Sequence, residues 1–168
     1  VLPLVGCEDH KAVLDGDRGP NTGGMGVVSP TEALPQALID RAMDEVVRPT
    51  VRQMAAEGRP LQGVIYAGLM IDGGKLNTLE FNCRFGDPET EAQLPRLTSD
   101  LLAVLDGAAR GRLPEGELVW DARTAVCVIG ASRGYPTDPV LGDRIQGLEE
   151  AEALPDVLVF HAGTRLQG

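Results

Sequence analysis

Positive charge is scarce in this chain of 168 residues. Fifteen lysines and arginines stand against 25 aspartates and glutamates, so the formal net charge is −10 and the sequence pI is about 4.6. A protein that binds nucleic acid or an anionic membrane surface without specificity needs a basic field. The composition therefore argues against both of these partners. It leaves room for a local cationic cluster that binds a small anionic substrate.

Cysteine is also rare, and its pattern excludes common cysteine sites. Cys7, Cys83 and Cys127 are widely and irregularly spaced, with no CxxC or Cys/His metal spacing. This usage predicts a reduced, cytoplasmic compartment. No apolar run approaches the length of a membrane span. The sequence opens without Met and stops just after an apparent strand, and we expect a piece of a longer protein.

Several stretches have the periodicity of regular secondary structure. We expect one helix over residues 32–57, with Thr31 as its cap and, because of Pro49, a break or kink near Arg48. We expect another helix over residues 89–112. Strands are expected at residues 1–5, 63–72, 76–82, 124–131 and 157–163, and the second and third of these form a hairpin. Residues 15–30 are rich in glycine and proline, which indicates a loop.

The most informative stretch is Leu79–Glu91, LEFNCRFGDPETE. Alternation along the strand places Leu79 and Phe81 on one face of the hairpin and Glu80 and Asn82 on the other. A carboxylate and an amide oxygen on one face suit a hard cation such as Mg²⁺. The alternative is two polar residues on a solvated sheet face, which half-exposed strands often show.

Charged residues follow this pair directly. Arg84 could clamp a carboxylate or phosphate through two parallel hydrogen bonds. It could instead form a weak surface ion pair with Asp87 or Glu89. Glu89 and Glu91 fit the first turn of the next helix, where negative charge is favourable, and for Glu91 we prefer that structural role.

The glycine-rich stretch upstream has two interpretations. Gly23 and Gly24 permit tight turning, or they bring backbone N–H groups close to an anion, with Asn21 and Thr22 adding hydrogen bonds. The stretch is neither GxxxxGK[ST] nor a clean GxGxxG, so neither nucleotide fingerprint applies. Lys11, just before it, offers a cation for a phosphate.

Taken together, these motifs resemble one enzyme family. RFGDPETE, preceded by EFN and with DHK, GPNTGGMG and SP upstream, resembles the phosphoribosylamine–glycine ligases of the ATP-grasp superfamily. YAGLM and the tail segments GYP, GD and FHAGT fit the same family, so the resemblance covers nearly the whole chain. Several long motifs in the right order make it specific.

The resemblance implies an α/β (α+β) fold. We expect a mixed, largely antiparallel ATP-grasp sheet flanked by helices, followed by part of a β-rich C-terminal domain. On this view residues 1–113 are the C-terminal part of the ATP-grasp domain, and residues 114–168 begin the next domain.

The resemblance also implies a reaction of purine biosynthesis. ATP phosphorylates the carboxylate of glycine, and the amine of 5-phosphoribosylamine attacks the acyl phosphate to give glycinamide ribonucleotide, ADP and phosphate. The complete enzyme is expected to be a cytoplasmic monomer that uses Mg²⁺ or Mn²⁺. Because the family's enzyme is much longer than this chain, we expect the chain alone to be inactive.

Roles for single residues follow from the matching motifs. The resemblance makes Glu80 and Asn82 the metal ligands. It places Arg84 and Asp87 beside the reacting groups, as catalytic residues. Leu69 stands near the position where many ATP-grasp enzymes carry another acidic ligand. The residues expected to bind substrate are Lys11, Asn21, Thr22, Gly23, Gly24 and Glu89.

Two alternatives remain open. One is a different ATP-grasp carboxylate–amine ligase, against which the intact RFGDPETE and GPNTGGMG motifs argue. The other is a non-catalytic module that binds metal or phosphate on the same scaffold. The retained Glu/Asn/Arg/Asp cluster weakens this second alternative, because a scaffold without a chemical role need not keep it.

Overall fold

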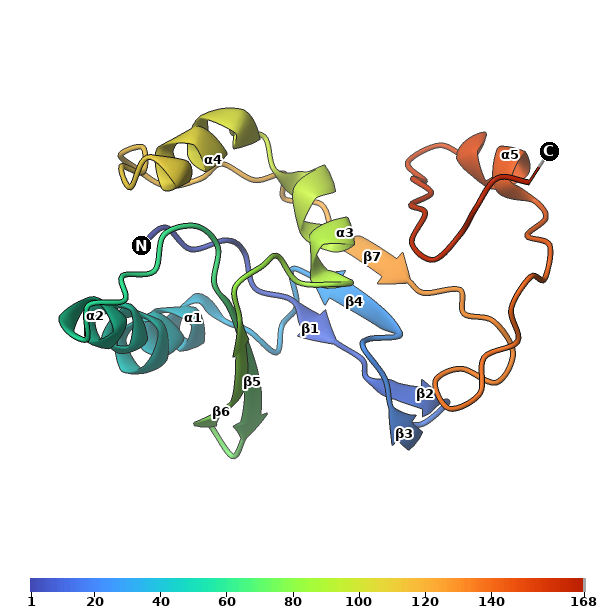
Figure 1. Ribbon diagram of the computed structural model, residues 1–168, viewed down its shortest axis with the longest axis horizontal. Helices are drawn as coiled ribbons and strands as arrows, with labels where there is room; N and C mark the ends of the chain where they lie inside the picture. The colour runs from blue at the N-terminus through green and yellow to red at the C-terminus, as the bar shows by residue number, and fades with distance from the viewer. Residues whose placement is uncertain (168) are drawn as a thin grey trace. The chain divides into compact units, whose positions relative to one another are not determined.

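The computed structural model describes residues 1–167 (Figure 1). The chain divides into two compact units, residues 1–129 and 130–168, and each is described by itself. The expected domain boundary after residue 113 stays a prediction. Within the described residues, no helix has both the length and the apolar character that crossing a membrane requires.

The first unit is built on short antiparallel strands (Figure 1). Its three-stranded sheet places β4 (Gly26–Ser29) between β1 (Glu8–Asp9) and β7 (Ala125–Val128). Two further ribbons pair β2 (Ala12–Leu14) with β3 (Arg18–Asn21), and β5 (Tyr66–Asp72) with β6 (Lys75–Asn82). The pairings of these strands are all antiparallel, which confirms the expected class.

Two of these strands correct the expectation that residues 15–30 form only a loop. In β3, Pro20 lacks an N–H donor, but a two-stranded ribbon offers it an edge position where none is needed. In β4, the run Gly-Val-Val-Ser pairs on both sides, and Val27 is only 1% exposed. These strands were not predicted because each has only four residues, and the glycines and prolines around them give the whole stretch the composition of a loop.

The hairpin expected over residues 63–82 is confirmed, although β5 begins only at Tyr66. Gly73 and Gly74 close the turn with φ of +53° and +77°, which favours glycine at both positions. Residues 1–5, also expected to form a strand, have no regular structure.

The first expected helix is present in three consecutive parts. It runs through α1 (Gln36–Ala42), a π-helical turn η1 (Met43–Val47) and α2 (Arg48–Ala56). The helix is not broken near Arg48 as expected: a π-helical turn ends at Val47, and α2 continues through Pro49, which cannot donate a backbone hydrogen bond. The prediction that Thr31 caps this helix is wrong, because the helix begins after Pro35. The Thr31 hydroxyl donates instead to Glu8 Oε2.

The second expected helix is wrong as one continuous element. It is split into α3 (Glu89–Gln93), a 3₁₀ turn η2 (Leu94–Arg96) and α4 (Leu101–Ala109). Pro95 lies in the interruption. Asp100 then starts α4, since its carboxylate accepts hydrogen bonds from the backbone N–H groups of Leu102 and Ala103, at 2.9 and 3.3 Å.

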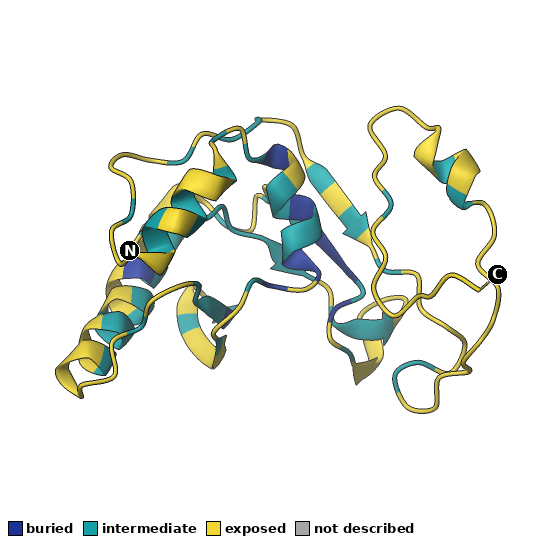
Figure 2. Ribbon diagram, turned by 45° about the horizontal axis from the view of Figure 1, so that its top comes forward, coloured by how far each residue is buried: buried dark blue, intermediate teal, exposed yellow. Residues whose placement is uncertain are grey.

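The best-buried residues gather where α3 packs on β4 and β7 (Figure 2). Val27, Pro88 and Ala92 are buried there. The buried Arg96 donates to Ser29 Oγ at 2.7 Å and to the carbonyls of Asp121 and Arg123. This core therefore holds the turn that precedes α3 against the three-stranded sheet.

The second unit has little regular structure in its described residues, 130–167. Its one helix there is α5 (Leu148–Glu152). The strand expected at residues 157–163 is wrong, because this segment pairs with no other strand of the described chain. A β-prone run becomes a strand only when a partner is available for its backbone groups.

Candidate functional site

One face of the β5–β6 hairpin carries the pair expected to bind metal. Glu80 lies opposite Gly68, and Asn82 lies opposite Tyr66. Residues directly opposite in an antiparallel pair share a face, so all four lie on the same side of the hairpin. The expected placement of Glu80 and Asn82 is thus confirmed, with Glu80 exposed and Asn82 half-buried.

The donors on this face fit a hard divalent cation in part. Glu80 offers carboxylate oxygens and Asn82 an amide oxygen, and Mg²⁺ commonly takes one or two protein oxygens and completes its shell with phosphates and water. Leu69 pairs with Thr78 and points to the opposite face from Gly68. In residues 1–167 no group of three or more His, Cys, Asp or Glu side chains could hold a metal, so a cation on this face would need ligands from outside the chain.

The glycine-rich loop is held against the strand that precedes it. Thr22 donates to the Lys11 carbonyl through its backbone N–H and its Oγ1, at 2.8 and 2.9 Å. Gly24 N–H donates to Thr22 Oγ1 at 3.0 Å, and Met25 N–H donates to the His10 carbonyl. The N–H groups of Thr22, Gly24 and Met25 are therefore used inside the protein, and the loop is fixed in shape.

An ion pair lies under this loop. Lys11 Nζ is 2.5 Å from Asp9 Oδ2, and the Asp9 side chain is only 11% exposed. Lys11 Nζ also donates to the Gly23 carbonyl at 3.4 Å. The buried Oδ1 of Asp9 has no hydrogen-bond partner among the described residues.

The loop touches the turn that precedes α3 at Gly24. Its φ of +145° favours glycine. A methyl group added there would overlap Pro88 Cδ and would lie 2.8 Å from Asp9 Oδ1. Two motifs that are about sixty residues apart in sequence thus meet at a position that only glycine can occupy.

Glu89 is buried at the start of α3 and faces the hairpin. It is 7% exposed. Burial raises the pKa of Tyr66 on the hairpin, and the nearby carboxylates of Glu89, Asp9 and Glu80 raise it further.

The other residues of the expected site lie at its edge. Arg84 is exposed and donates to the neighbouring Phe85 carbonyl at 2.8 Å, and no ion pair joins it to Asp87 or Glu89 in the described chain. Asp87 is exposed near β7, where its charge contributes to raising the pKa of Cys127 after burial and Glu91. Asn21 is exposed at the end of β3. Contacts thus join Lys11, Thr22, Gly23 and Gly24 to one another and to Asp9, and Gly24 lies against Pro88, the residue before Glu89.

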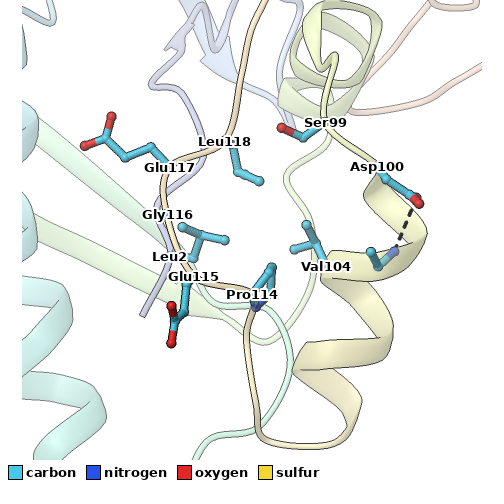
Figure 3. A pocket seen from close by; sticks show the side chains of 10 residues that line it. Leu2, Ser99, Asp100, Val104, Pro114, Glu115, Gly116, Glu117 and Leu118 are labelled. Atoms are coloured by element: carbon cyan, nitrogen blue, oxygen red, sulfur yellow. Dashed lines mark hydrogen bonds between the residues drawn. The ribbon is translucent and has the colours of Figure 1, made fainter.

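A cavity of about 180 Å³ lies elsewhere, between the start of α4 and the loop at residues 114–118 (Figure 3). Leu2, Val104, Pro114 and Leu118 form its apolar lining, and Asp100 stands at its rim. None of the residues expected to bind substrate or metal lines it. Ligand cavities for drug-sized molecules span roughly 300–1,000 Å³, so this cavity is too small for a nucleotide.

Three residues of the site escaped the sequence analysis. Asp9 stands at the end of β1, two residues before Lys11, and the ion pair between them became visible only in the structure. Tyr66 and Gly68 lie on the strand that pairs with Glu80 and Asn82, but the strand register was needed to place them opposite these residues.

Comparisons with known proteins bear on this arrangement. A family model described as "Phosphoribosylglycinamide synthetase, ATP-grasp (A) domain" matches residues 1–90. The chain is 50% identical to the phosphoribosylamine–glycine ligase of Vibrio cholerae and 51% identical to that of Pseudomonas aeruginosa, over 100% and 99% of its length. It spans 39% of the length of each of these relatives. A crystal structure of phosphoribosylamine–glycine ligase from Thermotoga maritima matches with a TM-score of 0.72 and 36% identity, over 83% of this chain and 34% of that one.

Proposed function

The chain belongs to the phosphoribosylglycinamide synthetase ATP-grasp domain family, and on this premise we propose that its complete protein ligates glycine to 5-phosphoribosylamine. The reaction converts ATP to ADP and phosphate, passes through a glycyl phosphate and yields glycinamide ribonucleotide. One observation of this chain carries the proposal. The glycine-rich loop meets the turn before α3 where Gly24 lies against Pro88, the residue before Glu89.

Glu80 and Asn82 are proposed to hold Mg²⁺ or Mn²⁺. Their side chains share one hairpin face, and their oxygens are the donors such cations prefer. A bound divalent cation neutralises charge on the nucleotide phosphates. Since the chain offers only two ligands on this face, the nucleotide phosphates and water are proposed as the remaining ones.

Arg84 and Asp87 are proposed to contact the reacting groups. The Arg84 guanidinium is exposed and forms no ion pair in the described chain. Its remaining N–H groups suit a bidentate bond to a phosphate or to the glycine carboxylate. Asp87 is also exposed, and its carboxylate suits a substrate amine.

The glycine-rich loop is proposed to cover the phosphate-bearing substrates. Lys11 supplies the cation, held in place by Asp9 and the Gly23 carbonyl. Thr22 and Gly24 set the shape of the loop, because their N–H groups already donate within it. A fixed loop over the site would exclude water from the acyl phosphate.

The test uses the complete protein with ATP, Mg²⁺, glycine and 5-phosphoribosylamine, and measures the formation of ADP. We expect turnover that requires both glycine and the amine. Glu80→Gln keeps the shape but removes the charge, and we expect at least about a hundredfold loss of kcat. Asp72→Asn, an exposed acid at the far end of the same hairpin, is the matched control and should keep activity.

The alternatives give different outcomes in this assay. ADP formation that glycine does not stimulate would indicate another carboxylate–amine ligase. Nucleotide binding without turnover, unchanged by Glu80→Gln, would indicate a binding module. Either result would overturn the proposed function.

A further inference from the structure

We propose that Arg96 is a positioning residue of the candidate site. Its guanidinium fixes the end of the α3–η2 segment to β4, and this holds the turn at residues 83–88 against the glycine-rich loop. The inference rests on the proposed function. It goes beyond that function because it assigns a role to a buried residue outside the expected metal, catalytic and substrate-binding sets.

The Arg96 side chain is a buried cation whose hydrogen-bond partners are all uncharged. It is 6% exposed. Its Nη1 donates to Ser29 Oγ at 2.7 Å, its Nε to the Arg123 carbonyl at 2.8 Å and its Nη2 to the Asp121 carbonyl at 3.0 Å. No ion pair joins it to a carboxylate in residues 1–167. Because a guanidinium donates in several directions within one plane, this side chain is suited to joining separate segments.

The partners of Arg96 lie where two neighbouring strands of the sheet meet. Ser29 ends β4 and pairs with Ala125, the first residue of β7. The Ser29 hydroxyl donates onward to the Gly6 carbonyl at 2.9 Å. The backbone N–H of Asp121 donates in return to the Arg96 carbonyl at 2.7 Å. Arg96 is thus bonded in both directions, and the end of η2 has a fixed place on the sheet.

The segment that ends at Arg96 is held to β4 at both of its ends. α3 and η2 follow one another directly from Glu89 to Arg96, and α3 packs on β4 and β7 (Figure 1). At the far end Arg96 bonds to Ser29, the last residue of β4. At the near end Pro88, directly before α3, lies against Gly24, two residues before β4 begins. Contacts at both ends of a short helical segment limit how far it can slide or tilt along the strand.

The turn before α3 takes its place from this segment. The backbone N–H of Thr90 donates to the Gly86 carbonyl at 3.3 Å, which ties the turn to the start of α3. The turn carries Arg84 and Asp87, the proposed contacts to the reacting groups, and it consists of bends and turns without regular structure. Functional side chains on such loops are positioned by the scaffold beneath them. Loss of the Arg96 bonds would therefore displace this turn from the glycine-rich loop.

The hairpin face proposed to hold metal stands outside this set of contacts. Glu80 and Asn82 take their places from the pairing of β6 with β5. None of the side-chain hydrogen bonds of Arg96 reaches either strand. We therefore expect loss of these bonds to slow the chemical step and to leave the binding of Mg²⁺–ATP unchanged, whereas general unfolding would lower both together.

The first arm of the test compares three variants of the complete protein. Ser29→Ala removes one acceptor with a small change of volume, and Arg96→Met removes all three bonds and keeps a long side chain. Met43→Ala is the control for lost stability, because Met43 is buried in η1, away from these bonds. The rate of ADP formation gives kcat, and calorimetric titration gives the dissociation constant of Mg²⁺–ATP.

We expect Ser29→Ala and Arg96→Met to lower kcat roughly tenfold or more, since small misplacements of reacting groups lower rates by up to about a hundredfold. Their affinity for Mg²⁺–ATP should match the wild type. Met43→Ala should lose thermal stability but keep kcat at temperatures where it is folded. Unchanged kcat in folded Ser29→Ala and Arg96→Met would show a merely structural role and overturn the proposal, as would a parallel loss of Mg²⁺–ATP binding. If Arg96→Met does not fold, Ser29→Ala alone decides.

The second arm measures amide hydrogen exchange in the complete protein, which needs no turnover. We expect Ser29→Ala to speed exchange in residues 83–90 and 22–25 and to leave β5 and β6 unchanged, because local opening follows the loss of local contacts. Met43→Ala should leave all of these segments as in the wild type. Unchanged exchange at residues 83–90 in Ser29→Ala would overturn the proposal. If the wild type forms no ADP in response to glycine, the proposed function fails, and this exchange pattern still decides whether Arg96 holds the turn.

Discussion

At the scale of single residues, the site depends on glycines that allow side chains to approach closely. Gly24 lets the loop touch Pro88, Gly68 leaves room for Tyr66 beside Glu80, and Gly86 accepts the folded Glu89 side chain. The contact at Gly24 joins two motifs that are far apart in the sequence, and the contacts at Gly68 and Gly86 shape the hairpin face and the turn before α3. A side chain at any of them would separate groups that the proposed chemistry needs together.

Gly24→Ala is expected to disrupt this arrangement in the complete protein. A non-glycine residue at φ of +145° adds about 1–3 kcal/mol of strain. The overlap with Pro88 adds a further roughly 1–3 kcal/mol. We expect a lower midpoint of urea unfolding together with a loss of ADP formation.

Gly63→Ala is the matched control for this substitution. Gly63 has a φ of +126°, and a methyl group added there would meet nothing within 4 Å. It should show the backbone strain without the overlap, and it should keep its activity. Equal destabilisation by the two variants would show that the contact with Pro88 does not matter.

At the scale of elements, the stretch after the RFGDPE motif shows how local signals set helix ends. Its apolar spacing suggested one long helix, but Pro95 interrupts it and Asp100 starts α4 afresh. The resulting α3 is short and packs against β4 and β7. Glu89 therefore lies at the start of a short helix. One continuous helix over residues 89–112 would have required a different path of the chain after α3.

The capping role of Asp100 gives a prediction for α4. Asp100→Ala removes the acceptor for the N–H groups of Leu102 and Ala103. We expect a destabilisation of about 1 kcal/mol, measured as a lower midpoint of chemical unfolding.

The comparison variant is Asp106→Ala on the same helix. It removes only an exposed ion pair with Arg110, four residues further on, which contributes roughly 0.3–0.5 kcal/mol. A loss at Asp106 as large as that at Asp100 would argue against the cap.

At the scale of the whole molecule, the expected ATP-grasp fold is confirmed by the family match and by the likeness to the solved enzyme. Large apolar side chains nevertheless remain exposed on the hairpin, with Leu79 at 59% and Phe81 at 40%. The chain spans only 39% of the curated relatives cited above. Its candidate site also offers only two proposed metal ligands, and the cavity of about 180 Å³ described above lies away from it.

These properties predict that the 168-residue chain alone does not catalyse the ligation. We expect no formation of glycinamide ribonucleotide by the purified chain under conditions in which the complete protein turns over. Circular dichroism must first show that the isolated chain is folded, so that inactivity is not mistaken for unfolding. Measurable turnover by the folded chain would contradict the prediction.

The features that depend on local backbone geometry could be predicted before the structure was known. The hairpin and the shared face of Glu80 and Asn82 follow from the two-residue period of a strand, and the ordered motifs identified the family. The short strands β3 and β4 were not predicted, because the composition of residues 15–30 as a whole is dominated by glycine and proline. We expected one continuous helix over residues 89–112, although Pro95 in the sequence is a signal for an interruption.

Which distant residues meet could be learned only from the structure. The contact of Gly24 with Pro88 and the hydrogen bond from the buried Arg96 to Ser29 join segments far apart in the chain. A sequence pattern reports the periodicity of one element, whereas such contacts depend on how several elements pack together. The same reason explains the strand expected at residues 157–163. Its apolar side chains were present, but no neighbouring strand in the described chain supplied its hydrogen bonds.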